Sequence, residues 1–209
     1  MRKSYFAALT IIFFSFACAI YFYPLMPLKM ASHWGITGEA DGWSGRLFGV
    51  FFMPILSLFL FHLFVFLPKI DPLKKNVKKF EKFFDWFVIG ILAFLLYLYL
   101  LTLAWNWGGR FNFILAILPA FIILFYLAGV LMEKSRRNYF IGFRTPWALT
   151  SDRNWEETNK MGGRLFKIAA LIGILGMFFQ AQAFLFLIGP LIIFTIYIFI
   201  YSYLKFKPK

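Results

Sequence analysis

The sequence predicts an all-α integral membrane protein, a bundle of six transmembrane helices with both termini on the cytoplasmic side. Hydrophobic residues make up 62% of its 209 residues, whereas about 45–50% is usual for a soluble domain. Six apolar runs are each close to the roughly 20 residues that cross the hydrocarbon core of a bilayer. The third observation is the placement of the Lys and Arg residues, which is strongly one-sided.

The six apolar runs predict the spans in order along the chain. They cover residues 5–23, 48–67, 86–104, 111–132, 165–181 and 183–204. The last two would read as one run of about twice the usual length, but Gln180 and Gln182 mark a break, so we expect a tight hairpin there. The chain then divides into three parts. Residues 1–67 hold two spans and the external loop 24–47, residues 68–132 a basic amphipathic segment and two spans, and residues 133–209 a cytoplasmic loop and the last two spans.

The basic residues predict the orientation of these spans. The chain has 22 Lys and Arg against 9 Asp and Glu, a net charge of +13. Eighteen of the 22 fall in the two terminal tails and in the second and fourth loops, which share one side of a six-span protein. Lys29, Arg46 and Arg110 fall on the other side, and Lys167 is close enough to its helix end to extend toward the basic side. Basic loops stay in the cytoplasm, so both termini of this cell-membrane protein should be cytoplasmic.

Two alternatives follow from the same features. Arg2 and Lys3 before an apolar stretch ending at residues 17–19 resemble a cleaved secretory signal, but a run of 19 residues exceeds the usual 7–15 of a signal core. A retained span is therefore preferred. The basicity could also indicate nucleic-acid binding, but the cations lie in membrane-bounded loops without a DNA-reading module. We expect membrane lipids as partners and no direct nucleic-acid contact.

The predicted spans contain little titratable chemistry. All nine acidic residues lie outside them, and only His62 and Lys167 lie inside. Ion-coupled transporters generally need ionisable groups within the membrane, so this composition disfavours that class. We interpret His62 as a histidine hydrogen-bonded between helices. Cys18 is the single cysteine, which excludes an intramolecular disulfide and a cysteine-based metal site.

The first external loop is the first candidate site. It places a histidine, two carboxylates and two tryptophans within 11 residues, among glycines that favour tight turns. The candidate residues are His33, Trp34, Gly38, Glu39, Asp41, Gly42 and Trp43. Three interpretations remain open, namely a recognition surface, a structural cap over the bundle and a metal site. The His-x5-Glu-x-Asp spacing matches no strong metal pattern, so no metal and no cofactor is expected.

The basic loops form the second candidate region. Leu73, Val77, Phe80 and Phe84 recur at helical spacing among lysines, which predicts an amphipathic helix lying on an anionic leaflet. In the fourth loop, Pro146 should keep residues 144–147 out of a helix. An interfacial helix should follow from about Asp152 toward Gly162. Arg144 is interpreted as an anchor to a lipid phosphate or a nearby acid, with contact to a specific partner as the alternative.

Both loops together resemble the SdpI family of bacterial membrane proteins, the immunity proteins against the sporulation-delaying toxin. In the first loop the resemblance rests on Pro27 and on the candidate residues from His33 to Trp43. In the fourth loop it rests on Gly142, Arg144, Thr145, Pro146, Trp147 and Leu149, and continues through Trp155, Thr158 and Gly162-Gly163. The six-span plan covers the whole chain.

The resemblance implies a non-enzymatic immunity and signalling protein. Its outer loop would meet an extracellular peptide toxin, and its cytoplasmic loop would engage a transcriptional repressor and hold it at the membrane. Two other classes stay open from the residues. One is a transporter or flippase of an amphiphile, and the other is a membrane-surface enzyme that uses His33, Glu39 and Asp41.

Overall fold

The computed structural model describes residues 3–179 and 182–206, and it is dominated by six long helices. Each is long and apolar enough to cross a membrane, which confirms the six-span prediction. They are α1 (Lys3–Phe22), α2 (Arg46–Ile70), α4 (Glu81–Asn106), α5 (Phe113–Lys134), α7 (Asp152–Leu175) and α8 (Ala183–Lys205). Shorter elements connect them, namely η1 (Tyr23–Leu25), β1 (Lys29–Trp34), β2 (Ala40–Gly45), α3 (Lys74–Lys79), α6 (Pro146–Leu149) and η2 (Gly176–Phe178). The chain is a multi-pass membrane protein.

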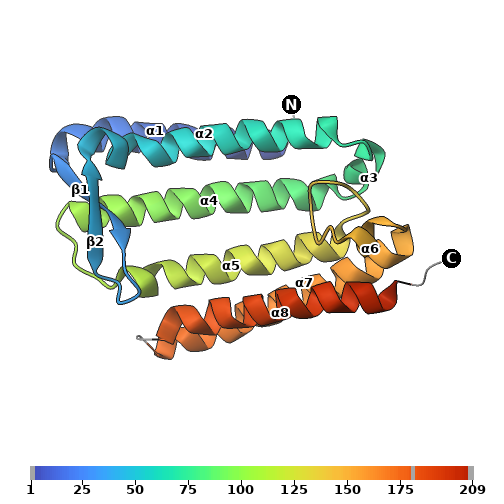
Figure 1. Ribbon diagram of the computed structural model, residues 1–209. Helices are drawn as coiled ribbons and strands as arrows, with labels where there is room; N and C mark the ends of the chain where they lie inside the picture. Colours follow the sequence, from blue (N-terminus) through green and yellow to red (C-terminus); the bar gives the residue numbers. More distant parts are fainter. Residues whose placement is uncertain (1–2, 180–181, 207–209) are drawn as a thin grey trace.

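The long helices lie side by side, and the short elements close the two ends of the bundle (Figure 1). Strands β1 and β2 cross one end, here called the hairpin end. Helices α3 and α6 and the irregular segment 135–145 cover the other, here called the loop end. Helix α7 packs between α5 and α8, while α4 contacts α1, α2 and α5. The start of α1 and the end of α8 lie toward the loop end, away from the hairpin.

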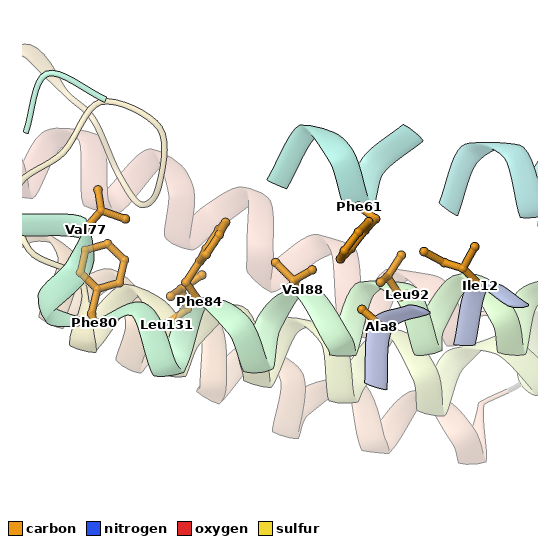
Figure 2. Close-up of a cluster of buried hydrophobic side chains, with 9 residues drawn as sticks. All are labelled: Ala8, Ile12, Phe61, Val77, Phe80, Phe84, Val88, Leu92 and Leu131. Carbon is orange, nitrogen blue, oxygen red and sulfur yellow. The ribbon is translucent and has the colours of Figure 1, made fainter. Parts of the chain in front are cut away.

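The interior near the loop end is a cluster of apolar side chains from four long helices and α3 (Figure 2). Its members are Ala8, Ile12, Phe61, Val77, Phe80, Phe84, Val88, Leu92 and Leu131. The basic second loop therefore does not lay its apolar face on lipid as predicted. Helix α3 is only 6 residues long, and Val77 and Phe80 turn into the bundle while the lysines stay exposed.

The segment before the fifth span also differs from the prediction. Residues 146–149 form a helical turn, because Pro146 occupies a first-turn position that needs no N–H donor and Thr145 caps it. The expected interfacial helix is not separate, since α7 runs without a break from Asp152 to Leu175. Helix α7 ends in η2, and Gln180, at the predicted break, lies outside the described residues.

The titratable groups near the spans are also placed differently from the prediction. Six of the nine carboxylates lie within α4, α5 and α7, near the helix ends at the loop end. Among them, Glu133 forms an ion pair with Lys167 on α7. His62 bonds to the carbonyl of Leu58 on its own helix, at 2.8 Å, and to no neighbouring helix within the part of the chain that the structure describes.

Candidate functional site

The first loop folds into an antiparallel hairpin, which the sequence reading did not anticipate. Strand β1 pairs with β2 from Lys29–Gly45 to Trp34–Ala40, with irregular register on both sides of His33. The turn closes where the Gly35 N–H donates to the Glu39 carbonyl at 2.9 Å. Gly38 has a positive φ of 84°, and a side chain there would collide with Asn112. The glycine thus serves both the turn and the close approach to α5.

Two asparagines at helix ends fix this hairpin to the bundle. Asn106, the last residue of α4, accepts from the Ala31 N–H at 2.7 Å and donates to the Ala31 carbonyl at 3.0 Å. Asn112, which caps α5, donates to the Thr37 carbonyl at 2.9 Å. The Asn106 amide satisfies the backbone groups of Ala31 on the edge of β1 that has no partner strand, and the Asn112 amide holds the turn. Sequence reasoning placed neither asparagine in the site.

Trp34 and Trp43, the two tryptophans of the motif, have different environments. The Trp34 ring stacks on Phe113, with centroids 3.7 Å apart and planes 9° from parallel, and meets Trp105 edge-on at 5.8 Å. Trp43 is 58% exposed. Trp34 is therefore part of the packing between the hairpin and the bundle, whereas Trp43 is displayed.

The polar motif residues lie on the exposed side of the hairpin. His33 Nδ1 lies 2.5 Å from Asp41 Oδ1, with side chains 72% and 53% exposed, and Glu39 is exposed as well. Gly42 lies against the His33 side chain, since a Cβ there would come within 2.9 Å of it. Within residues 3–179 and 182–206, no group of three or more His, Cys, Asp or Glu side chains is placed to hold a metal ion.

An apolar cavity of about 300 Å³ lies beneath the hairpin. Its walls come from the hairpin, α2, α4, α5 and the start of α8 and include Trp34, Phe48, Phe52, Thr102, Phe121 and Phe184. The indole nitrogen of Trp34 is buried and has no hydrogen-bond partner among the described residues. A buried N–H without an acceptor is costly, so the Trp34 indole is an unsatisfied donor in a residue that lines the cavity.

At the loop end, two buried polar side chains organise the segment 135–145. Asn138 is fully buried, and its amide bonds the backbone of Arg136, Phe140 and Ile141 at 2.7–3.0 Å. Asp71, after α2, accepts from the Leu73 N–H at 2.6 Å and from the Tyr139 N–H at 2.9 Å. The second and fourth loops are thereby joined into one structure. Neither Asn138 nor Asp71 belongs to a motif that the sequence analysis identified.

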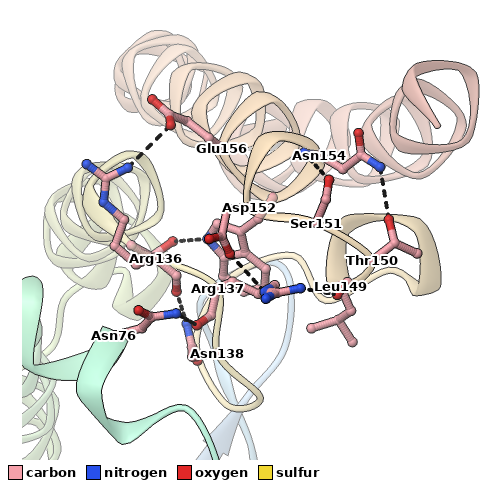
Figure 3. A network of polar contacts seen from close by, with 12 residues as sticks. Asn76, Arg136, Arg137, Asn138, Leu149, Thr150, Ser151, Asp152, Asn154 and Glu156 are labelled. Atoms are coloured by element: carbon pink, nitrogen blue, oxygen red, sulfur yellow. Dashed lines mark hydrogen bonds and ion pairs between the residues drawn. The ribbon is translucent and has the colours of Figure 1, made fainter. Parts of the chain in front are cut away.

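Charged side chains extend this network toward the start of α7 (Figure 3). Arg137 pairs with Asp152 at 2.9 Å and donates to the Leu149 carbonyl at 3.2 Å. Its own carbonyl accepts from the Asn76 amide at 3.0 Å. Arg136 pairs with Glu156 at 3.3 Å. These contacts hold α6 and the first turns of α7 against the segment 135–145.

The Arg-Thr-Pro-Trp stretch joins α6 to α8. Thr145 caps α6 by accepting from the Ala148 N–H at 3.0 Å, and its hydroxyl lies 2.5 Å from that of Ser202 on α8. Thr158 of α7 donates to the same Ser202 hydroxyl at 3.1 Å. The Trp147 ring packs edge-on against two aromatic rings of α8, Phe199 and Tyr203.

Asn159 of α7, which the sequence motif did not include, also holds the loop. Its amide bonds both the N–H and the carbonyl of Phe143, at 2.7 and 3.2 Å, next to Gly142, which has a φ of 101°. A side chain at Gly142 would collide with Asn159. One turn earlier on α7, Trp155 is buried and donates to Ser135 at 3.2 Å. These motif residues therefore build the loop.

Arg144 is the exposed charged member of the motif. Its guanidinium donates to the Tyr139 carbonyl at 2.8 Å, and no carboxylate pairs with it among the described residues. Arg144 therefore contacts a backbone carbonyl instead of the nearby acid that was expected. Arg144 is thus exposed on a loop that the buried motif residues build.

Comparisons with known proteins match both ends of the bundle. Residues 134–202 match the SdpI/YfhL protein family, and residues 10–58 match a domain of unknown function, DUF1648, which takes in the hairpin. Immunity protein SdpI of Bacillus subtilis (strain 168) is 26% identical over 176 residues, which cover 84% of this chain and 82% of that protein. No solved structure matches. With the paired motifs in place at the two ends of the bundle, the chain is therefore similar to the SdpI/YfhL protein family over residues 134–202 and to an immunity protein over most of its length.

Proposed function

We propose that this chain is a non-enzymatic immunity protein whose hairpin meets a peptide toxin at the outer face of the cell membrane. The similarity to an immunity protein over most of the chain supports the class. The excess of cations at the loop end supports placing that end in the cytoplasm and the hairpin outside.

The outward display of His33, Glu39, Asp41 and Trp43 on an anchored hairpin carries the proposal. An exposed aromatic ring beside charged and polar groups is typical of protein recognition surfaces. Because Asn106 and Asn112 hold the opposite side of the hairpin, a peptide would meet a preorganised surface and not a mobile loop.

Survival under toxin tests this assignment. A toxin-sensitive bacterial strain lacking its own immunity protein would express the chain and be exposed to the sporulation-delaying peptide toxin. We expect protection by the wild-type chain and its loss with Trp43→Ala or Glu39→Gln. Trp107→Ala is the matched control, since Trp107 is 63% exposed at the same end but outside the motif. No protection by the wild-type chain at confirmed membrane expression would contradict the proposal.

We further propose that the loop end engages a cytoplasmic repressor protein when toxin is bound. The supporting observation is Arg144, exposed on a loop held by Asn138, Thr145 and Asn159. Helix α5 begins under the hairpin at Phe113, after its cap Asn112, and ends at this loop, so one continuous helix connects the two faces. A ligand changes such a distant surface only if it binds two conformations of the bundle differently.

Recruitment of a fluorescently tagged transcriptional repressor tests this second step. We expect the repressor to move to the membrane after toxin addition, and Arg144→Ala to abolish that movement while leaving the protein in the membrane. Lys75→Ala removes one exposed cation at the same end and serves as the control. Equal recruitment by the Arg144 variant would remove this residue from the proposed contact.

A further inference from the structure

A polar pocket of about 270 Å³ lies where the end of α5 meets the first half of α7. Four basic and two acidic side chains line it, namely Glu133, Lys134, Arg136, Glu156, Lys160 and Arg164. It is separate from the hairpin surface and from Arg144. At about 30 Å³ per water molecule, the volume has room for roughly nine waters or a small anion with its hydration.

The carboxylates of this pocket are already matched by cations. Glu156 pairs with Arg136 at 3.3 Å, and Glu133 pairs with Lys167, which approaches from farther along α7, at 2.8 Å. Lys160 and Arg164 form no ion pair among the described residues. Lys134 has no carboxylate partner there either, and its Nζ lies 5.7 Å from the centre of the Phe83 ring. The pocket therefore presents three cations whose charge nothing in it balances.

The pocket also lies at a defined level of the bundle. On α5 the apolar run from Phe113 ends at Met132, immediately before Glu133. On α7 the apolar run begins at Leu165, immediately after Arg164. The cations thus lie where the apolar surface of both helices stops, which is the level of the lipid phosphates. Basic pockets between membrane-spanning helices commonly bind anionic lipid headgroups.

We propose that Lys134, Lys160 and Arg164 bind the phosphate group of an anionic membrane lipid at the junction of α5 and α7. The Arg164 guanidinium can donate two parallel hydrogen bonds to a phosphate, and the two ammonium groups add charge without geometric demands. Arg136 of the segment 135–145 lines the same pocket and is bonded to Glu156, so the bound headgroup would lie against that segment. The bound lipid would thus be part of the support of the loop end.

Retention of lipid by the purified full-length protein tests the site. The protein would be reconstituted in vesicles of phosphatidylcholine with phosphatidylglycerol, re-extracted in mild detergent and examined by native mass spectrometry. One cation near an anionic surface contributes roughly fivefold to affinity. We therefore expect Lys160→Gln with Arg164→Gln to lower retained phosphatidylglycerol by about tenfold or more. The control removes two exposed cations elsewhere at the same end, Lys75→Gln with Lys82→Gln, and should change retention less than twofold.

Further measurements distinguish the competing explanations. Glu156→Gln removes one carboxylate and frees Arg136, so it should raise the amount of retained phosphatidylglycerol about twofold or more. This variant keeps the test valid if the double variant misfolds. Equal losses in the site and control variants would indicate diffuse surface charge and overturn the proposal. If millimolar inorganic phosphate stabilised the protein as much as phosphatidylglycerol does, the pocket would be assigned to free phosphate. The lipid assignment would then be overturned.

Discussion

Lys167 and Glu133 form an ion pair across α5 and α7, and each side chain passes over a glycine of the opposite helix. Their charged atoms are 2.8 Å apart, and the side chains are 26% and 19% exposed. A Cβ on Gly129 would come within 2.7 Å of the Lys167 stem, and one on Gly163 within 2.6 Å of the Glu133 stem. The two glycines therefore make space for the pair that joins the helices.

Breaking this pair should destabilise the bundle more than removing it entirely. Lys167→Met removes the ion-pair partner of the Glu133 carboxylate, which is 19% exposed, and we expect a loss of about 2–3 kcal/mol in the free energy of unfolding. The loss should stay below the 3–5 kcal/mol typical of fully buried pairs, because Glu133 also lines a polar pocket. The double variant Lys167→Met with Glu133→Gln should regain at least about 1 kcal/mol of that loss. Unfolding in mixed micelles measures all four proteins of the cycle. Strictly additive single effects would mean that the two groups do not interact.

The crossing of α5 and α7 should be intolerant of a single methyl group. At Gly163 a Cβ would collide with the Gly129 carbonyl, and a Cβ at Gly129 would lie 2.6 Å from the Gly163 carbonyl. Backbone cannot move away as a side chain can, so Gly163→Ala should cost about 1–3 kcal/mol of unfolding free energy. Gly189→Ala is the matched control, because nothing lies within 4 Å of a Cβ there. The same micelle titration should find that control unchanged or slightly stabilised, and equal losses in both variants would contradict this account of the crossing.

The number of membrane-spanning helices was predictable because hydropathy alone sets it. The residues at which these helices begin and end were not predictable. Lys167 was expected to extend toward the basic side, and its ammonium does lie at the loop end. Its partner was missed because Glu133 was placed in a loop by composition, although helical hydrogen bonding carries α5 through Lys134. Polar residues at a helix end lower the hydropathy of a window without ending the helix.

The candidate residues were found, but their orientations were not predictable from the sequence. The hairpin was missed because the irregular register at His33 interrupts the alternation that identifies a strand. Trp34 and Trp43 are equally apolar in the sequence, and the positions of Phe113 and Trp105, more than 70 residues after Trp34, decide which one packs against the bundle. Asn138 and Asp71 gave no signal because each acts through backbone groups, which any residue can supply.

Substitutions of the two motif tryptophans should separate the effect on protein stability from the effect on recognition. Trp34→Ala removes the stack on Phe113 and opens space above the cavity, so we expect a loss of about 2–3 kcal/mol in unfolding free energy. Trp43→Ala should change that free energy by less than about 0.5 kcal/mol, since the ring is mostly in solvent. Thermal unfolding of both purified variants measures the difference. A large loss in the Trp43 variant would show that this ring supports the hairpin.

Ser202 should be the most sensitive hydroxyl at the loop end, because two others depend on it. Thr145 and Thr158 both bond to Ser202 Oγ, and all three residues are buried. Ser202→Ala leaves these hydroxyls with one partner fewer in a site that water does not reach, so we expect a cost of about 1–3 kcal/mol. It should also increase hydrogen exchange at the Ala148 N–H, because Thr145 then caps α6 less firmly. Thr10→Ala removes an exposed hydroxyl that bonds only within its own helix and should be nearly neutral. Unchanged exchange at Ala148 alongside a full loss of stability would mean that Ser202 acts on the packing of α7 against α8 and not through the cap of α6.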